Sequence, residues 1–176
     1  GNHDYGDYQR WSSKKEKEKN FKNLLEIQKK IGFTVLMNEH KYIVKDDQKI
    51  AIIGVENWGA RFNQLGDIEK SIKNISKKDF KIVLSHDPTH WERILKDHPK
   101  QFELTLSGHT HGMQFGIEVP GYIKWSPVKW AYKYWAGLYN HKEKYLNVNR
   151  GFGVLAYPGR IGIWPEITSI TLKKLI

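Results

Sequence analysis

The stretch ELTLSGHTHG at residues 103–112 joins an apolar strand to a polar loop that carries two histidines. A second stretch, KIVLSHDP at residues 81–88, has the same organisation and delivers His86 just after its apolar run. Ligands of open α/β sheets bind where the loops at the carboxyl ends of neighbouring strands converge. The two stretches therefore predict an α/β fold in which His86, His109 and His111 share one crevice.

The rest of the chain supplies further strands and intervening helices. Strands outnumber helices, which favours an α/β or α+β class. An amphipathic helix is expected at residues 12–31, capped by Ser12 or Ser13, because its apolar residues recur at helical spacing. Further helices are expected at residues 66–75, capped by Asp67, and 88–99. Strands are expected at residues 33–45 with a break, 49–55, 80–84, 113–119, 144–154 and 166–176.

The composition describes a globular chain with a basic surplus. Its 176 residues suffice for one domain with a core, and a net charge of +10 favours phosphates, nucleic acid or an acidic membrane as partners. The chain contains no cysteine, so disulfides, thiolate metal sites and cysteine nucleophiles are excluded. No stretch has the length and apolarity of a membrane-spanning helix.

The chain opens with GNHD, which places three polar, chemically able residues behind a flexible glycine. Runs of this kind usually occur at the working end of a strand, whereas chain ends are usually the least ordered part of a domain. If this loop joins the histidine crevice, Asn2 supplies an amide oxygen as a possible ligand. His3 and Asp4 then supply a His–Asp pair that is not needed as a ligand.

The spacing of His109 and His111 is suited to a pair of metal ions. In a tight loop framed by glycines, two imidazoles separated by one residue can face one small volume and address two ions, as a two-metal phosphoryl site requires. Imidazole and amide ligands with carboxylates suit Zn, Fe or Mn. The remaining candidates are expected to be ordinary polar residues without a metal role, namely His40, His90, His98 and His141.

The three motifs GNHD, SH and GHTH occur here in the order found in calcineurin-like metallophosphoesterases, and the chain resembles that family over its whole length. The family's two earlier motifs, D-x-H and G-D-x-x-D, do not precede Gly1. The resemblance implies a four-layer α-β-β-α sandwich, of which residues 1–176 form only the C-terminal portion. We therefore expect a single incomplete domain that starts at the third family motif.

The resemblance also implies metal ligands. Asn2, His86 and His109 would ligate one of two divalent transition metal ions, Mn, Zn or Fe, and His111 would ligate the other. The bridging aspartate would come from the absent motifs. Asp87 would orient a ligand or cap the following helix.

The same resemblance implies catalytic roles for His3 and Asp4. His3 would stabilise charge on the phosphate or protonate the leaving oxygen, while Asp4 would hydrogen-bond the imidazole. A metal-bridging hydroxide would attack phosphorus in line and cleave a phosphodiester or pyrophosphate bond. Without the bridging aspartate, residues 1–176 alone are expected to bind at most one ion weakly and to be inactive.

The region after the last motif is similar to a membrane-associated branch of the family, which includes enzymes resembling UDP-2,3-diacylglucosamine pyrophosphatase. Ser126, Pro127 and Gly137 predict the cap, first residue and end of a short helix. The candidates for a membrane interface are Trp125, Trp130 and Trp135, because aromatic rings beside lysines suit the headgroup region. A lid whose aromatic rings are simply buried is the alternative.

Arg150 and Arg160 could reach an anionic substrate, with surface salt bridges as the alternative. The substrate implied is a phosphate-containing small molecule or lipid, such as a lipid-linked or nucleotide-sugar compound, and the protein would be membrane-associated with these residues soluble. Nucleic acid is not expected as a partner. The competing function is a non-catalytic phosphate- or membrane-binding module, a degenerate or truncated relative.

Overall fold

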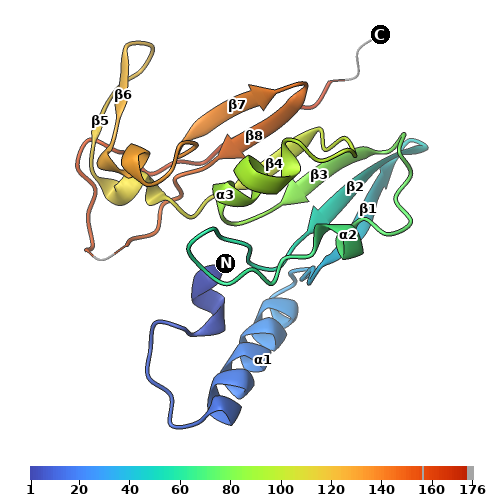
Figure 1. Cartoon of the computed structure of the whole chain (residues 1–176), viewed down its shortest axis with the longest axis horizontal. Coiled ribbons are helices and arrows are strands. Elements are labelled where there is room, and N and C mark those ends of the chain that lie inside the picture. Colours follow the sequence, from blue (N-terminus) through green and yellow to red (C-terminus); the bar gives the residue numbers. More distant parts are fainter. Residues whose placement is uncertain (156, 174–176) are drawn as a thin grey trace.

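The computed structural model describes residues 1–155 and 157–173, and its centre is a six-stranded sheet in the order β1-β2-β3-β4-β8-β7 (Figure 1). The four central strands β2, β3, β4 and β8 run parallel, and the two edge strands pair antiparallel. This arrangement confirms the α/β class. The strands are β1 (Glu39–Lys45), β2 (Gln48–Gly54), β3 (Phe80–Leu84), β4 (Leu104–Ser107), β7 (Gly137–His141) and β8 (Lys144–Val148).

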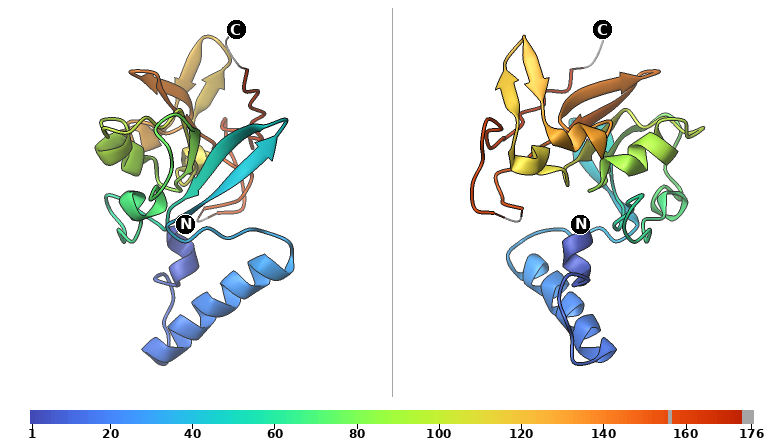
Figure 2. Two further views of the ribbon diagram at one scale, coloured as in Figure 1. Left: turned by 90° about the vertical axis from the view of Figure 1, so that its right-hand side faces the viewer. Right: turned by 60° about the vertical axis from the view of Figure 1, so that its left-hand side comes forward.

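A separate hairpin and several short helices complete the described residues. The antiparallel hairpin of β5 and β6 protrudes beside the sheet (Figure 2). Asp67 and Asp87 cap the helices α2 and α3 with their carboxylates, as the sequence predicts for Asp67. The elements are α1 (Lys14–Lys30), α2 (Ile68–Ser71), α3 (Pro88–His90), η2 (Trp91–Leu95), β5 (Ile117–Val119), β6 (Ile123–Trp125), η1 (Asn2–Tyr5), η3 (His111–Gln114) and η4 (Pro127–Trp130).

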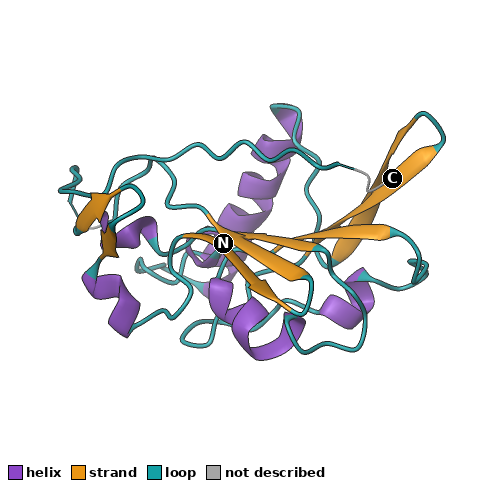
Figure 3. Ribbon diagram, turned by 90° about the horizontal axis from the view of Figure 1, so that it is seen from above, coloured by secondary structure: helices purple, strands orange, loops and turns teal. Residues whose placement is uncertain are grey.

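One face of the sheet carries the main core. Side chains of alternate strand residues pack there against α2, α3 and the turn that follows α3, and Figure 3 shows the short helices gathered along one side of the strands. Each large side chain buried in this way contributes about 1.5–3 kcal/mol. The fully buried members include Ala51, Ile53, Ile72, Val83, Trp91, Leu95, Phe102, Leu146 and Val148.

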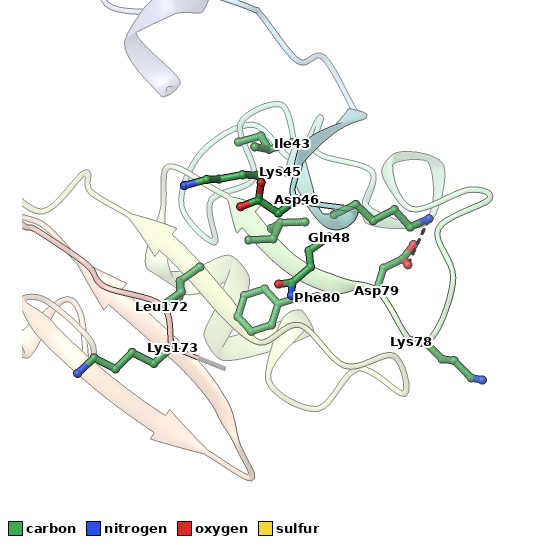
Figure 4. Close-up of a pocket in the computed structure, with 11 residues that line it drawn as sticks. Ile43, Lys45, Asp46, Gln48, Lys78, Asp79, Phe80, Leu172 and Lys173 are labelled. Atoms are coloured by element: carbon green, nitrogen blue, oxygen red, sulfur yellow. Dashed lines mark ion pairs between the residues drawn. The ribbon is translucent and has the colours of Figure 1, made fainter. Parts of the chain in front are cut away.

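The opposite face of the sheet is also apolar but is covered incompletely. Leu84 and Leu138 on this face are 40% and 65% exposed, and no second sheet lies over it within the described residues. Leu172 of the C-terminal tail approaches Phe80 across a groove of about 680 Å³ (Figure 4). The described residues thus contain one sheet of the expected four-layer sandwich, with helices on one side only.

Helix α1 projects away from the sheet (Figures 1 and 2). Ser13 caps it as the sequence predicts, by accepting a hydrogen bond from the Glu16 amide, but none of its residues is buried. Its described contacts are with the first turn of the chain, where Phe21 stacks on Tyr5 with ring centroids 4.8 Å apart. The apolar stripe of the helix is therefore real, but it does not pack on the sheet.

Several secondary-structure predictions are wrong in whole or in part, and the strand expected at residues 144–154 ends at Val148. Residues 166–173 form no strand, because a strand needs a neighbouring edge to pair with, and residues 174–176 lie outside the described part. Residues 33–38 also lie outside any strand. The helix expected up to Gly137 ends at Trp130, although Ser126 caps it as predicted. Gly137 instead begins β7 with a φ of 88°, a left-handed conformation that favours glycine.

Candidate metal centre

The loop after β4 has an unusual backbone. His109 and His111 have φ angles of 69° and 51°, and Gly112 between the loop and η3 has 56°. Left-handed conformations cost non-glycine residues roughly 1–2 kcal/mol and persist only where the surroundings impose them, often at functional sites. Here Thr110 is held from both sides, because its hydroxyl accepts from the Gly112 amide and donates to the Trp135 carbonyl.

The loops after β3 and β4 are tied directly together. The Gly108 amide donates a 2.9 Å hydrogen bond to the carbonyl of His86, and β3 and β4 are neighbouring parallel strands. This bond aligns the two loops at the carboxyl edge of the sheet. The sequence prediction that these loops converge is therefore confirmed, and His86 and His109 lie with ring centroids 5.0 Å apart.

Asn2 completes a triangle of polar atoms with these two histidines. Its Oδ1 lies 3.0 Å from His86 Nε2 and 3.1 Å from His109 Nδ1, and the two ring nitrogens are 3.2 Å apart. The side chain of Asn2 is buried, and its Nδ2 donates a 2.6 Å hydrogen bond to the hydroxyl of Tyr8. That bond turns the amide oxygen toward the imidazoles.

Residue 1 must be glycine because its backbone closely approaches the imidazole of His86. A Cβ at Gly1 would lie only 2.7 Å from the imidazole of His86, which is shorter than real Cβ contacts. The backbone at the start of the chain therefore passes directly over the His86 ring. Only glycine permits this approach without moving that ring.

The triangle fits a divalent metal ion. Zn–N and Zn–O bonds are about 2.0–2.2 Å long, so neighbouring ligand atoms around such an ion stand about 3.0–3.5 Å apart. The three atoms here have that separation, and all three carry lone pairs when the imidazoles are neutral. No group of three or more His, Asp or Glu side chains forms a metal site within residues 1–155 and 157–173, so the amide of Asn2 is essential to this set.

His111 contributes a further candidate ligand atom. Its Nδ1 is buried and has no hydrogen-bond partner among the described residues. A buried polar atom without a partner costs about 1–3 kcal/mol, so it indicates a group that the atom serves. The charge of a protonated His111 would lower the pKa of both His86 and His109, which shows that the ring belongs to the same neighbourhood.

The site favours neutral imidazoles, the form that binds metals. Burial, assisted by the positive α-amino group of Gly1 and by the other histidines, lowers the pKa of His86 to about 3. Burial is also the largest cause of the lowered pKa of His109 and His111. Each ring nitrogen that faces the triangle can therefore offer its lone pair at neutral pH.

Asp87 supports the site from behind. Its Oδ1 accepts hydrogen bonds from the amide and the hydroxyl of Thr89, which caps α3. Its Oδ2 is buried and lies 3.5 Å from Nε2 of His109, the ring nitrogen that faces away from Asn2. Asp87 thus caps the following helix, one of the two roles expected of it, and the role of orienting a metal ligand stays a prediction. Gly59 permits this position, because a Cβ there would lie 2.6 Å from Oδ2.

The expected hydrogen bond between His3 and Asp4 is absent from the described structure. His3 stacks on Tyr8 with ring centroids 4.3 Å apart, and Asp4 instead pairs with the α-amino group of Gly1. The α-amino group at residue 1 engages this carboxylate, and the role of Asp4 in orienting His3 stays a prediction. His3 itself is exposed beside the cluster, where its charge influences the pKa of His86, His109 and His111.

Both arginines proposed as substrate ligands are committed to the protein itself. Arg150 is almost buried, and its Nε and Nη1 pair with the carboxylates of Glu166 and Glu118. Arg160 donates to the carbonyls of His111, Arg150 and Gly153. The salt-bridge alternative holds for Arg150, whose charge is neutralised by two partners, and Arg160 fastens the histidine loop to the tail.

The three tryptophans have different environments. Trp130 is 74% exposed, and Trp125 is partly buried and meets it edge to face. Trp135 is 6% exposed and packs in a small core with Val128 and Ile163. The expectation that Trp135 faces a membrane is therefore corrected, because its ring is already buried in the protein. For that residue the buried alternative is right.

The other histidines have ordinary polar partners, as predicted. Each has at least one hydrogen-bond partner outside the cluster, at 2.8 to 3.1 Å. The pairs are His40 with the Ser71 carbonyl, His90 with the Ser85 hydroxyl, His98 with Glu69 and His141 with Asp97.

No helix in the described ranges is long and apolar enough to cross a bilayer.

Sequence reasoning missed three aromatic residues that hold the site. Tyr8 binds the amide of Asn2, Phe62 meets the His109 ring edge to face, and the Tyr132 hydroxyl lies 2.8 Å from His109 Nε2. Tyr132 lies in the aromatic segment that the sequence singled out, but nothing in its spacing indicated a contact with His109. These contacts come from the tertiary fold alone.

Comparisons with known proteins point to one family. The model of the calcineurin-like phosphoesterase family matches residues 1–113. The chain is 33% identical over 177 residues to the uncharacterized metallophosphoesterase YkuE of Bacillus subtilis (strain 168), which covers 99% of this chain and 54% of that protein. It is 31% identical over 147 residues to the phosphodiesterase YaeI of Escherichia coli (strain K12), covering 84% and 50%.

A further relative, the uncharacterized metallophosphoesterase YkoQ of Bacillus subtilis (strain 168), is 27% identical over 168 residues, with 96% of this chain and 56% of that protein covered. The chain thus spans about half the length of the curated relatives it matches. No solved structure matches the chain.

Proposed function

The chain belongs to the calcineurin-like phosphoesterase family, and on that premise we propose that it is part of a binuclear metal-dependent hydrolase of phosphodiester or pyrophosphate bonds. One observation carries the proposal. Asn2 Oδ1, His86 Nε2 and His109 Nδ1 converge with the spacing of ligands around one divalent ion. Membership of this family implies that the protein uses divalent metal ions. The number of ions and their identity are part of our proposal.

The ligand set divides between two positions. Asn2, His86 and His109 would hold one ion, and the buried Nδ1 of His111 would contribute to the other. Ions bound there would supply Lewis-acid stabilisation of the phosphoryl oxygens and would lower the pKa of a bound water. Neutral ligands alone leave the ionic charge uncompensated, so acidic ligands from outside residues 1–176 complete the proposed site.

His3 is the proposed acid for the leaving oxygen. Its ring is exposed beside the cluster and is held flat against Tyr8, so it can reach a substrate that the ligands would position. No carboxylate among the described residues accepts a hydrogen bond from this ring, so its proton is not fixed on one nitrogen. A protonated imidazole there would donate a proton to the leaving oxygen and become neutral, and it would then take up a proton from solvent to restore the acid.

The test uses the complete protein, with the missing half of the relatives' length present. We expect hydrolysis of bis(p-nitrophenyl) phosphate with Mn²⁺ or Zn²⁺, and a loss of at least about 100-fold for His109→Ala. His141→Ala is the matched control, because that histidine pairs with Asp97 outside the cluster. Hydrolysis that survives His109→Ala, or that needs no divalent ion, would refute the proposal.

A second proposal concerns lipid-linked substrates and rests on an exposed apolar surface. We call the hairpin patch the exposed side chains of Phe115, Ile117, Val119, Tyr122, Ile123 and Trp130. Lys129 and Lys133 are exposed beside it. Aromatic and apolar side chains next to lysines suit a membrane with anionic headgroups. The patch supports membrane association and a lipid-linked pyrophosphate as substrate.

Vesicle sedimentation tests this second proposal. We expect binding to phosphatidylglycerol vesicles, weaker binding to phosphatidylcholine vesicles, and a clear loss for Tyr122→Ala. Tyr145→Ala is the matched control, since that tyrosine is 43% exposed on the sheet rather than 88% exposed on the hairpin. Binding to vesicles by a complete protein that hydrolyses no phosphate ester would favour the non-catalytic membrane-binding module.

A further inference from the structure

We propose that Tyr132 is a positioning residue that keeps the proton of His109 on Nε2, so that the lone pair of Nδ1 faces Asn2 and His86. The inference rests on the metal site proposed above. It adds a function for a residue that lies outside every motif of the chain, on the segment between the β5–β6 hairpin and β7.

The geometry around His109 separates its two nitrogens. Nε2 points away from the triangle toward the hydroxyl of Tyr132, at 2.8 Å, and toward Oδ2 of Asp87, at 3.5 Å. Nδ1 points into the triangle. An imidazole that binds a metal through one nitrogen carries its proton on the other, and the acceptor there selects the tautomer.

Without Tyr132, the acceptors on the two sides of the His109 ring would compete for its proton. Oδ1 of Asn2 lies 3.1 Å from Nδ1 and would accept a proton from that nitrogen, which would block its lone pair. On the other side, Asp87 offers a carboxylate that can only accept, but at 3.5 Å it is too far for a strong hydrogen bond. Tyr132 supplies the close acceptor that shifts the balance toward Nε2–H.

Tyr132 is built to stay in this place. Its ring is 9% exposed and packs with Val128 and Trp135, and it meets the His109 ring edge to face with centroids 5.3 Å apart. A tyrosine hydroxyl is an uncharged phenol near neutral pH, and its oxygen can therefore accept from Nε2.

The first test needs no metal. In chain labelled with ¹⁵N-histidine, the ring shifts of His109 should report the Nε2–H tautomer, and Tyr132→Phe should move the population toward Nδ1–H. Tyr134→Phe is the matched control, because that ring packs on Trp91 and its hydroxyl has no hydrogen bond in the described residues. An unchanged His109 tautomer in Tyr132→Phe would overturn the proposal.

The second test measures Zn²⁺ affinity by calorimetry on the same variants. Loss of a residue that orients a ligand typically costs about 10–100-fold in affinity. We therefore expect Tyr132→Phe to bind Zn²⁺ about 10-fold more weakly than wild type, and Tyr134→Phe to bind it with the affinity of wild type. Asp87→Asn, which replaces the remaining acceptor, should shift the tautomer in the same direction. Equal Zn²⁺ affinity in wild type and Tyr132→Phe would contradict the proposal, whereas absent binding in wild type would refute only the metal site.

Discussion

The two faces of the six-stranded sheet are both apolar, yet only one of them is covered. Val83 and Leu146 point to the face that carries α2 and α3 and are fully buried, whereas Leu84 and Leu138 point to the other face and are 40% and 65% exposed. A strand alternates its side chains between faces, so sequence pattern assigns residues to a face. Whether that face is covered depends on what the rest of the protein supplies.

The candidate metal centre depends on the covered face. His86 and His109 follow β3 and β4, two central strands whose positions are set by the packed core and by the hydrogen bond between their loops. Helix α1 makes its main contacts with η1 rather than with the sheet, and the tail reaches the open face at Leu172, in the groove beside Phe80. We propose that a further segment of the protein, which the greater length of the relatives allows, covers the open face and brings the acidic ligands.

The largest expected difference between the faces is in folding stability. Leu146→Ala should lower the free energy of unfolding by about 3–5 kcal/mol, because it leaves a cavity in a packed core. Leu138→Ala should cost less than about 0.5 kcal/mol, because that side chain is already largely in water. Urea unfolding measures both values, and equal losses would show that the open face is packed in solution.

Acid should weaken the covered face through His90. Burial lowers the pKa of His90 to about 4, so the unfolded chain binds a proton between pH 6.5 and 4 that the folded chain does not. Stability is therefore full above pH 6.5 and falls by about 3 kcal/mol as pH drops through this window. Urea unfolding of wild type and His90→Gln at pH 7 and pH 5 measures the effect, which should be smaller in the variant. A difference between wild type and variant that does not change with pH would contradict it.

A smaller effect is expected where the covered side meets the metal centre. Gly59→Ala places a Cβ 2.6 Å from Oδ2 of Asp87 and must displace that carboxylate from His109. We expect a loss of roughly 1–3 kcal/mol in thermal unfolding, since a buried carboxylate is moved. Gly121→Ala is a control with open space around its Cβ, although its positive φ carries a strain cost. Equal stability of Gly59→Ala and wild type would show that Asp87 is mobile.

The smallest effect is expected beyond the open side, in α1. Ser13→Ala removes the N-cap of α1 and should lower the local stability of this helix by about 1 kcal/mol. Because α1 has no buried residue, global unfolding should change by less than about 0.5 kcal/mol. Hydrogen exchange of α1 amides should accelerate while β3 amides stay protected. A matching loss of protection in β3 would show that α1 packs on the sheet.

Sequence reasoning succeeded where local pattern decides the outcome. The strand–loop–histidine stretches were sufficient to predict that His86 and His109 converge with Asn2, since parallel neighbours place their loops at one edge. The aspartate and serine caps at Asp67, Ser13 and Ser126 were also correct, because capping depends on a few adjacent residues.

It failed where the outcome depends on distant partners. The carboxylates of Glu118 and Glu166 neutralise Arg150, and the small core around Val128 buries Trp135, but neither contact has a signature in spacing. The tail at residues 166–173 alternates like a strand, yet it pairs with no strand in the described chain and is tied instead to the segment after β8 through the Glu166 amide and Thr168. Tyr132, which contacts His109, was missed for the same reason.

The central claim is that three side chains from distant parts of the chain hold one divalent ion. Anomalous diffraction at the zinc edge, from crystals grown with Zn²⁺, locates such an ion directly. The account predicts a peak within about 2.0–2.2 Å of Asn2 Oδ1, His86 Nε2 and His109 Nδ1. Zinc bound only at another pair, such as His98 with Glu69, or no peak at this edge of the sheet, would contradict it.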